Sequence, residues 1–298
     1  MQGTYLITGG EGFIGRNIKQ YLRKNNCNAL TLDIEGKPDY MISVTNFPSL
    51  MDMDEEFDGV FHLAATTSPP QFESDPIGGF NVNANGTLNI LEYAKRKKIR
   101  RVVLASSSAT YGNSGSISQE EIVPNTYSNL YPITKVIDEY LARYYTVRKE
   151  VECIPLRYFN TYGIGENSKA QYASVVWRFI TDLQNYKTPT IFGNGEQSRD
   201  FIYVEDTARA SVLAMEKGKP GESYNIGTGK TTNFNDIYRM VAEEMHSQIR
   251  AEHIPNPLKN YQYFTHADIT KARKDLGFKP IFDLRSGIRK MITETKSI

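Results

Sequence analysis

The sequence predicts an α/β protein built on a doubly wound, mainly parallel sheet, and three observations carry this prediction. Short apolar runs alternate with amphipathic stretches over the first 165 residues. A glycine-rich turn joins the first apolar run to the first helical pattern, and an acidic residue ends the second run. Beyond residue 165, prolines and glycines interrupt the pattern, which indicates a second, smaller domain.

Five apolar runs are expected to be strands of this sheet, because each is short and bounded by polar or turn-forming residues. They span residues 5–7, 29–32, 60–63, 102–105 and 153–156. The helical spacing of Ile14, Ile18 and Leu22 predicts a helix after the first run. Further helices are expected at 81–98 and 132–148.

Composition excludes several classes of protein. The 298 residues carry 35 Lys and Arg against 34 Asp and Glu, so a net charge of +1 gives no bulk electrostatic reason to bind nucleic acid or an anionic membrane. No apolar run approaches the ~20 residues of a membrane-spanning helix, and no secretory signal pattern follows Met1. Cys27 and Cys153 are too few for a disulfide framework, and the four histidines have no metal-ligand spacing. We therefore expect a reduced, cytoplasmic protein without a metal.

The glycine-rich turn predicts a dinucleotide site. Gly9, Gly12 and Gly15 have the spacing G-x-x-G-x-x-G between a strand and a helix. Such glycines allow a tight turn and let a pyrophosphate approach the backbone at the helix N-terminus. Asp33, at the end of the second strand, is placed to bind the adenosine ribose and to repel a 2′-phosphate. We expect a Rossmann-type sheet that binds NAD rather than NADP, although a flexible turn and a strand-end aspartate are the simpler readings.

A tyrosine and a lysine predict acid/base chemistry. Tyr131 and Lys135 are four residues apart, so a helix places them on one face, where the ammonium lowers the pKa of the phenol. Their helix follows the strand that ends in the run Ser106, Ser107 and Ser108. In a doubly wound fold the carboxyl end of that strand faces the cofactor crevice, where a hydroxyl can bind a substrate oxygen. A surface pair and a serine turn remain the alternatives.

These motifs resemble the extended short-chain dehydrogenase/reductase family, and within it nucleotide-sugar epimerases of the UDP-glucose 4-epimerase type. The resemblance runs nearly from end to end. It is carried by Asp33 and by segments 8–15, 62–65, 83–87, 106–112, 131–135, 156–163, 193–206 and 225–229. It implies an NAD-binding domain over 1–165, with about 200–226 returning to it, and a substrate-binding domain over 166–199 and 227–298.

The resemblance also implies roles for individual residues. Tyr131 is the expected acid/base, Lys135 its activator and a ligand of the nicotinamide ribose, and Ser107 the catalytic hydroxyl, with Ser108 as an off-by-one alternative. The implied NAD contacts are Gly9, Gly12, Phe13, Ile14, Gly15, Asp33, Leu63, Ala64, Ala65, Asn83, Ser106, Tyr131, Lys135 and Tyr158. The implied substrate contacts are Ser107, Asn160, Arg199 and Thr265, with Asn160 and Arg199 on the diphosphate side. For Arg199 a salt bridge to Asp200 or Glu205 is the simpler reading.

Two further features of the family bear on substrate and assembly. Counting back from the segment 267–271 places Thr265 beside the sugar's C2 substituent, where a small side chain leaves room for an N-acetyl group. If the register slips, Tyr263 or Phe264 faces the sugar instead. Family members pair the two helices expected at 81–98 and 132–148 across a two-fold axis, which implies a homodimer.

The chain departs from its relatives at several positions. No acidic pair follows Ser107, which argues against a 4,6-dehydratase, and Ser43 and Val44 stand where many relatives have an acidic residue near the adenine. The Arg-x-Gly-Asp segment of many 4-epimerases is missing, and Lys259 is a candidate replacement for its arginine. Segments 167–170, 173–175 and 256–268 look like ADP-heptose 6-epimerases, in which the lysine matching Lys169 is a second acid/base. A solvated loop lysine is the simpler reading of Lys169.

The predicted function is that of an NAD-dependent UDP-hexose 4-epimerase acting through a transient 4-keto sugar. Three alternatives stay open. One is an epimerase of another nucleotide sugar, such as the heptose type, and another is a net dehydrogenase or reductase that exchanges NAD with solvent. The third is a non-catalytic NAD-binding regulator, which the presence of Tyr131, Lys135 and Ser107 together disfavours.

Overall fold

The computed structural model describes residues 2–295 except 68, 113–114, 122–126, 128, 168, 170–172 and 258–260. A seven-stranded sheet with the order β11-β6-β5-β4-β1-β2-β3 forms the centre of the fold, and neighbouring strands are parallel. Its strands are β1 (Thr4–Thr8), β2 (Asn28–Asp33), β3 (Tyr40–Met41), β4 (Gly59–His62), β5 (Arg101–Ser107), β6 (Glu152–Tyr158) and β11 (Tyr224–Ile226). The predicted doubly wound fold is confirmed.

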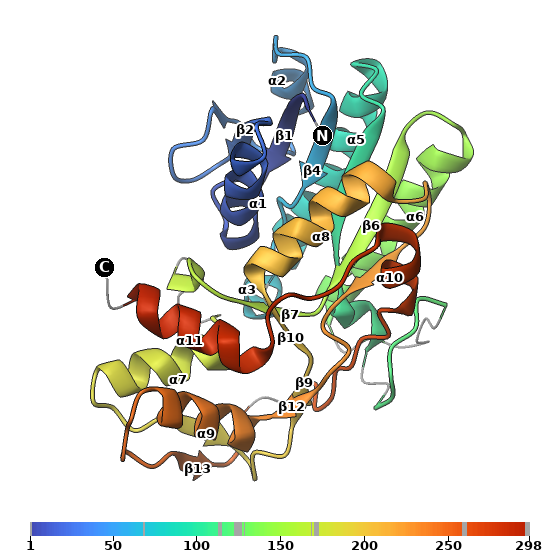
Figure 1. The fold of residues 1–298 in the computed structure, drawn as a ribbon. Helices are drawn as coiled ribbons and strands as arrows, with labels where there is room; N and C mark the ends of the chain where they lie inside the picture. Colours follow the sequence, from blue (N-terminus) through green and yellow to red (C-terminus); the bar gives the residue numbers. More distant parts are fainter. Residues whose placement is uncertain are drawn as a thin grey trace.

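Helices cover both faces of this sheet (Figure 1). One face carries α1 (Phe13–Lys24), α8 (Val204–Lys217) and α10 (Thr270–Leu276). The other carries α2 (Phe47–Met51), α5 (Gly86–Arg96) and α6 (Leu130–Val147). Successive residues of β1 show why: Leu6 packs into one hydrophobic core and Ile7 into the other, because side chains alternate along a strand.

The helix expected at 81–98 is divided. Helices α3 (Pro69–Ser74) and α4 (Pro76–Phe80) come first, a π-helical turn η1 (Asn81–Asn85) follows, and α5 begins at Gly86. The turn buries Asn83, whose Nδ2 donates to the carbonyl of Thr66 at 3.0 Å and to Oγ1 of Thr134 at 2.9 Å. These bonds tie the turn to α6 and to the segment after β4, a contact that sequence periodicity does not reveal.

A third hydrophobic core lies beyond the carboxyl ends of β5 and β6 (Figure 1). It is built by α7 (Val175–Gln184), α9 (Phe234–Glu244) and α11 (Leu284–Thr295). Three short strand pairs accompany it: β7 (Asn160–Tyr162) with β10 (Phe201–Tyr203), β8 (Thr190–Phe192) with β13 (Glu252–Ile254), and β9 (Ser198–Arg199) with β12 (Thr232–Asn233). A 3-10 turn, η2 (Ser108–Tyr111), follows β5.

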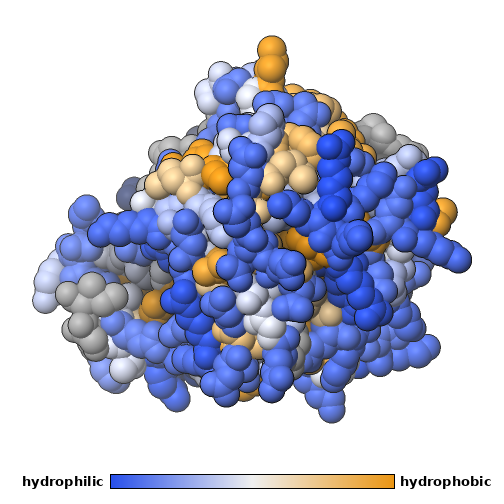
Figure 2. Space-filling view, turned by 90° about the horizontal axis from the view of Figure 1, so that it is seen from above, coloured by the Kyte–Doolittle hydropathy of each residue, from blue (hydrophilic) through white to orange (hydrophobic). Residues whose placement is uncertain are grey.

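The predicted division into two domains stays a prediction. Segment 200–226, which is predicted to return to the first domain, contributes β11 to the central sheet. Helix α10 also packs on this sheet, through Ala272 and Leu276, although it lies within 227–298, the range predicted for the second domain. Cys27 and Cys153 are buried thiols. Within the described residues no helix is both long and apolar enough to cross a bilayer. On the face shown in Figure 2, hydrophilic side chains predominate and apolar ones form only small groups.

Candidate active site

The glycine turn lies where the strand order of the sheet reverses, between β1 and its neighbours β2 and β4. Gly9 has a φ of +65°, and a Cβ added to it would lie 2.7 Å from the amide nitrogen of Ala64. A Cβ added to Gly15 would lie 2.3 Å from the carbonyl oxygen of Gly9. Only glycine therefore permits the close approach at positions 9 and 15. Gly12 is the N-cap of α1, and Phe13 and Ile14 lie in the first turn of that helix. The turn and the α1 N-terminus form a cradle that fits a pyrophosphate.

Asp33 ends β2 beside this cradle. Its Oδ2 accepts a hydrogen bond from the amide of Glu11 at 2.9 Å, and its Oδ1 accepts one from the amide of Ile34 at 2.8 Å. These bonds hold the carboxylate at the edge of the glycine turn, where the adenosine ribose of a dinucleotide is bound in this fold. The residues present therefore fit NAD.

A buried polar chain supports the other side of the cradle. Thr8 Oγ1 accepts from the amides of Leu63 and Ala64 at 3.2 Å each and is bonded to His62 Nδ1 at 2.7 Å. His62 Nε2 is bonded to Thr87 Oγ1 at 3.0 Å. Burial, with a smaller effect from the ammonium of Lys135, lowers the pKa of His62 to about 3, so the ring is neutral at physiological pH.

This row of hydrogen-bonded side chains positions Leu63, Ala64 and Ala65, which follow β4. Sequence reasoning assigned no role to His62 or Thr87, although both lie in the segments that carry the family resemblance. The available signal was their polarity within apolar runs, because a buried polar side chain needs a partner.

Tyr131 and Lys135 lie in the first turns of α6. Asn129 is the N-cap of this helix, and its side-chain oxygen accepts from the amide of Tyr131 at 3.1 Å. Tyr131 is half-buried and its ring lies 6.2 Å from that of Phe72, centroid to centroid. Lys135 is buried, and its Nζ lies 3.0 Å from Oδ2 of Asp138. The net effect of its surroundings raises the pKa of Lys135: burial is the largest single effect and lowers it, but Asp138, Tyr131 and Glu139 together outweigh burial.

A cavity of about 360 Å³ brings the predicted acid/base residue together with three of the four predicted substrate residues. Of the predicted set it contains Ser107, Tyr131, Tyr158, Asn160 and Arg199, and both Ser107 and its alternative Ser108 line it. Sequence reasoning assigned no role to several of its other lining residues: Thr67, Phe159, Thr161, Glu166, Ser174, Val175, Phe201 and Phe234. They come from loops and from β7, β10, α7 and α9, which the sequence does not show to be adjacent.

Arg199 supplies a cation to this cavity. Its side chain is buried, donates to the carbonyl of Ser198 at 3.0 Å and lies over the ring of Tyr261 at 5.2 Å. The predicted alternative, a salt bridge, is not formed with either carboxylate. Asp200 accepts from the amides of Thr228, Gly229 and Ala267, and Glu205 pairs with Lys290. Burial lowers the pKa of Arg199 from its ordinary value. A buried guanidinium that pairs with no described carboxylate suits a phosphate ligand.

Thr265 does not line the cavity. It is buried, and its Oγ1 accepts from Nδ2 of Asn160 at 2.8 Å and from the amide of Asp200 at 3.2 Å. Asn160 lines the cavity, so Thr265 contacts a cavity residue. Tyr263 is exposed. The placement of Thr265 beside a sugar stays a prediction.

Two residues that are predicted to contact NAD form side-chain hydrogen bonds within the protein. Ser106 donates to Oε1 of Glu139 at 2.5 Å, and the hydroxyl of Tyr158 is bonded to Ser211 at 2.8 Å. Val44 is buried in the core beside Gly86, which accounts for an apolar residue at that position. Lys259, the candidate replacement for the missing arginine, lies outside the described residues.

Lys169 lines the cavity beside Phe13. Its Nζ lies 4.1 Å from the centroid of that ring and 3.3 Å from Oε1 of Glu166. Glu166 is fully buried, and it also accepts from the amide and hydroxyl of Ser174 at 2.8 and 2.7 Å. Lys169 is therefore held against a structural carboxylate rather than standing alone on a solvated loop.

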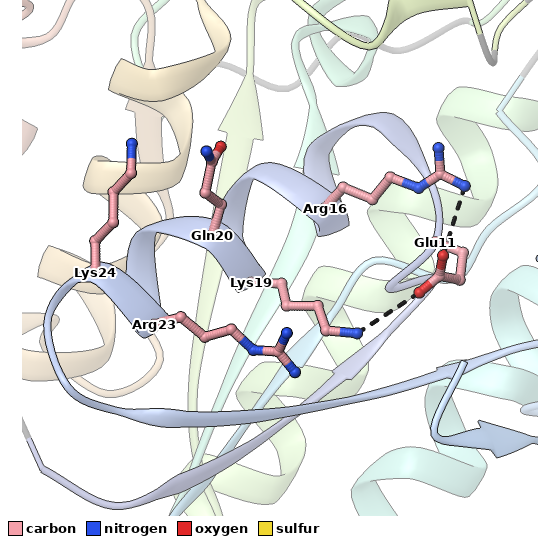
Figure 3. A pocket seen from close by; sticks show the side chains of 6 residues that line it. All are labelled: Glu11, Arg16, Lys19, Gln20, Arg23 and Lys24. Carbon is pink, nitrogen blue, oxygen red and sulfur yellow. Dashed lines mark ion pairs between the residues drawn. The ribbon is translucent and has the colours of Figure 1, made fainter. Parts of the chain in front are cut away.

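A larger hollow, of about 570 Å³, lies along the outer side of α1 (Figure 3). Arg16 and Lys19 reach toward Glu11 and pair with it at 3.5 and 3.8 Å, and Gln20, Arg23 and Lys24 complete the lining. Neither member of the tyrosine–lysine pair contributes to it. Among the described residues no group of His, Cys, Asp and Glu side chains could hold a metal ion.

A glycine turn at the switch point of a doubly wound sheet, next to a cavity lined by tyrosine, serine and arginine, is typical of a dinucleotide-dependent enzyme. The chain belongs to the NAD dependent epimerase/dehydratase family, whose model matches residues 5–227.

Individual relatives narrow the class further. A protein described as a candidate UDP-glucose 4-epimerase from Methanocaldococcus jannaschii is 33% identical, over 98% of both chains. The solved UDP-N-acetylglucosamine 4-epimerase of Methanobrevibacter ruminantium M1 has a TM-score of 0.92 at 26% identity, over 99% of both chains. The solved UDP-glucose 4-epimerase of Thermotoga maritima has a TM-score of 0.92 at 27% identity, also over 99% of both chains. The predictions of NAD as cofactor and of a sugar-nucleotide epimerase are confirmed.

Proposed function

We propose that the chain interconverts UDP-hexoses at C4 of the sugar, in the cavity lined by Tyr131 and Arg199. The observation that carries this proposal is that one cavity joins an acid/base candidate, a hydroxyl donor and a buried cation that pairs with no carboxylate among the described residues. The relatives support UDP-sugars as the substrate class. The glycine turn, the N-terminus of α1 and Asp33 would hold NAD, which would supply a reversible hydride acceptor for the sugar carbon.

The protein's own residues move the proton and orient the sugar. Ser107 donates a hydrogen bond to the reacting oxygen of the sugar, and Tyr131 takes the proton of that oxygen and later returns it. The ammonium of Lys135 stabilises the phenolate form of Tyr131. Removal of a proton from the hydroxyl and of a hydride from its carbon leaves a ketone. With Tyr131 as proton acceptor and NAD as hydride acceptor, the reaction requires no other reactant.

Arg199 and Asn160 are proposed to hold the diphosphate side of the substrate. A guanidinium matches two phosphate oxygens at once, and Arg199 has donors that no carboxylate among the described residues occupies. When the substrate is held by its diphosphate, the sugar remains free to rotate about its link to that diphosphate. This freedom is what a 4-epimerase needs, because hydrogen must leave one face of the ring and return to the other.

The proposed sugars are UDP-glucose and UDP-galactose, with the N-acetylated pair also accepted. A relative that acts on UDP-N-acetylglucosamine supports the second pair. In the proposed arrangement Thr265 affects the bound substrate indirectly, through its bond to Asn160, since its own side chain is buried. We also propose a homodimer, and a reducing cytoplasmic setting, which two buried thiols support.

A substrate panel tests the proposal. The holoenzyme is incubated with UDP-, ADP-, GDP- and dTDP-sugars, and new epimers are sought by NMR. We expect the C4 epimers of UDP-hexoses to form without a stoichiometric change in the nicotinamide absorbance band. Net accumulation of reduced cofactor would instead show a dehydrogenase, and epimerisation of ADP-heptose alone would show the heptose-type reaction.

A lysine variant separates the two epimerase readings, because Lys169 lines the cavity together with Tyr131. Lys169→Ala is expected to change turnover of UDP-hexoses only a few-fold, since its ammonium is already paired with Glu166. In a heptose-type enzyme, where this lysine transfers a proton, the loss would be about 100-fold or more. Lys187→Ala, at an exposed lysine after α7, is the matched control.

A further inference from the structure

Helix α6 carries a third ionisable side chain on the face of Tyr131 and Lys135. Asp138 follows Lys135 by three residues, so one turn of helix brings the two side chains together. Oδ2 of Asp138 lies 3.0 Å from Nζ of Lys135, and the two side chains are only 3% and 5% exposed. The proposed mechanism uses Tyr131 and Lys135 but leaves this carboxylate without a role.

The surroundings of Asp138 are closed to water. Its Oδ1 is buried and has no hydrogen-bond partner within the described part of the chain. The titratable groups that face the pair are Tyr131 and Glu139 of α6 and His62 of β4, while the hydroxyl of Thr87 from α5 also faces Asp138. His62 is neutral, and Glu139 is paired with Arg157 at 2.7 Å. Asp138 is therefore the carboxylate in direct contact with the ammonium of Lys135.

This contact has two consequences for the tyrosine. An ammonium has three N–H donors, so a bond to Asp138 fixes its orientation while leaving two donors for other partners. A carboxylate at 3.0 Å also offsets positive charge on the neighbouring ammonium of Lys135. The positive charge of Lys135 favours the phenolate form of Tyr131. A phenolate that is stabilised too strongly is a weak base, whereas an effective acid/base residue ionises near the working pH.

We propose that Asp138 is a positioning residue for the proposed epimerisation: it fixes the ammonium of Lys135 and, by offsetting its charge, sets the pH at which Tyr131 ionises. The proposal rests on the proposed role of Tyr131. Tyr131 and Glu139 also favour the charged form of Lys135, whereas burial opposes it.

The ionisation of Tyr131 in the NAD-bound protein is the primary test, because it requires no substrate. The ultraviolet band of tyrosinate is followed against pH, and the curve of the Tyr131→Phe variant is subtracted. In the Asp138→Asn background we expect the titration of Tyr131 to move to lower pH by about one unit, since the ammonium is no longer offset. Asp138→Glu, which keeps the charge, should return it toward the wild-type position.

The matched control is Asp52→Asn, which removes the same charge from an exposed residue at the end of α2 and should leave the titration unmoved. An unmoved or raised titration in folded Asp138→Asn protein overturns the proposal. If Asp138→Asn does not fold, Asp138→Ser, which leaves room for water, is measured in the same way and judged by the same outcomes.

A measurement on the unmodified holoprotein covers the case in which neither variant folds. Carbon NMR of labelled aspartate carboxyls reports whether Asp138 is ionised. The proposal requires an ionised Asp138 throughout the titration of Tyr131, and a neutral carboxyl there overturns it.

The acid limb of kcat for UDP-hexoses should shift with the titration of Tyr131. If no UDP-hexose is turned over, the proposed function fails, whereas the titration of Tyr131 still decides the role of Asp138.

Discussion

Arg157 on β6 and Glu139 on α6 form a buried, two-pronged ion pair. Nη2 of Arg157 lies 2.7 Å from Oε2 of Glu139, and its Nε lies 2.8 Å from Oε1. Ser106 and Ser223 also donate to this carboxylate, at 2.5 and 3.1 Å. The pair joins the helix that carries Tyr131 to the sheet whose strand ends line the cavity. It therefore holds the acid/base residue relative to the substrate site.

Glu139→Gln is expected to lower the free energy of unfolding by about 3 kcal/mol, because it leaves the buried guanidinium of Arg157 without its counter-charge. Urea denaturation measures the change. Glu243→Gln, which breaks an exposed pair with Arg285, is the control and should cost under about 1 kcal/mol. Equal losses in the two variants would show that the buried pair does not stabilise this contact.

Tyr131→Phe is expected to reduce kcat by about 100-fold or more, because it removes the proton acceptor while keeping the ring. NAD should still bind, which can be measured by cofactor content after purification. Tyr186→Phe, at an exposed tyrosine after α7, is the matched control. Near wild-type turnover in Tyr131→Phe would contradict the assignment of this residue.

Asp33→Asn is expected to narrow the preference for NAD over NADP by about tenfold, because a neutral amide no longer repels a 2′-phosphate. The wild-type protein should bind NAD more tightly than NADP. Calorimetric titration of both cofactors into cofactor-free protein provides the comparison, with the exposed Asp54→Asn as control. Tighter binding of NADP by the wild type would count against the role of Asp33.

His62 makes the folded state sensitive to acid. Burial lowers its pKa to about 3 in the folded protein, against about 6.5 when unfolded, so between these values the unfolded state binds more protons. Stability from this group is fully present above about pH 6.5 and is lost as the pH falls, by about 2 kcal/mol between pH 7 and pH 5.

Urea denaturation at pH 7 and pH 5 measures this loss. Relative to the wild type, His62→Gln should be less stable at pH 7 but lose about 2 kcal/mol less on going to pH 5, because the side chain that titrates is gone. His253→Gln, at an exposed histidine, should keep the wild-type dependence. The same pH dependence in wild type and His62→Gln would rule out this histidine as the cause.

The outer face of α6 predicts an interface between two copies. Tyr140, Tyr144 and Val147 are 63%, 55% and 75% exposed, and Leu88 of α5 is 38% exposed. Light scattering should give the mass of a dimer, and Tyr144→Glu should shift it toward the monomer by burying a charge. Tyr186→Glu, at a residue that is 89% exposed after α7, is the control. A wild-type protein that is monomeric at every concentration would refute the dimer.

What the sequence by itself determined is local or carried by a whole-chain resemblance. Strand runs, the glycine turn and the spacing of Tyr131 and Lys135 are short-range patterns, and backbone geometry translates them directly into a strand, a turn and a helix face. The identity of the family and its cofactor followed from their order along the chain.

What only the tertiary structure decided involves residues that are distant in sequence or that choose between competing partners. Thr265 lies next to Asn160 rather than in the cavity wall, and Arg199 meets no carboxylate in the described part of the chain. The packing of β7, β10 and the segment before α10 sets these neighbours. Lys135 has Asp138 within reach in sequence, but only burial of both side chains makes that contact strong. Periodicity reports which face a residue occupies, whereas the partner it meets depends on how the faces pack.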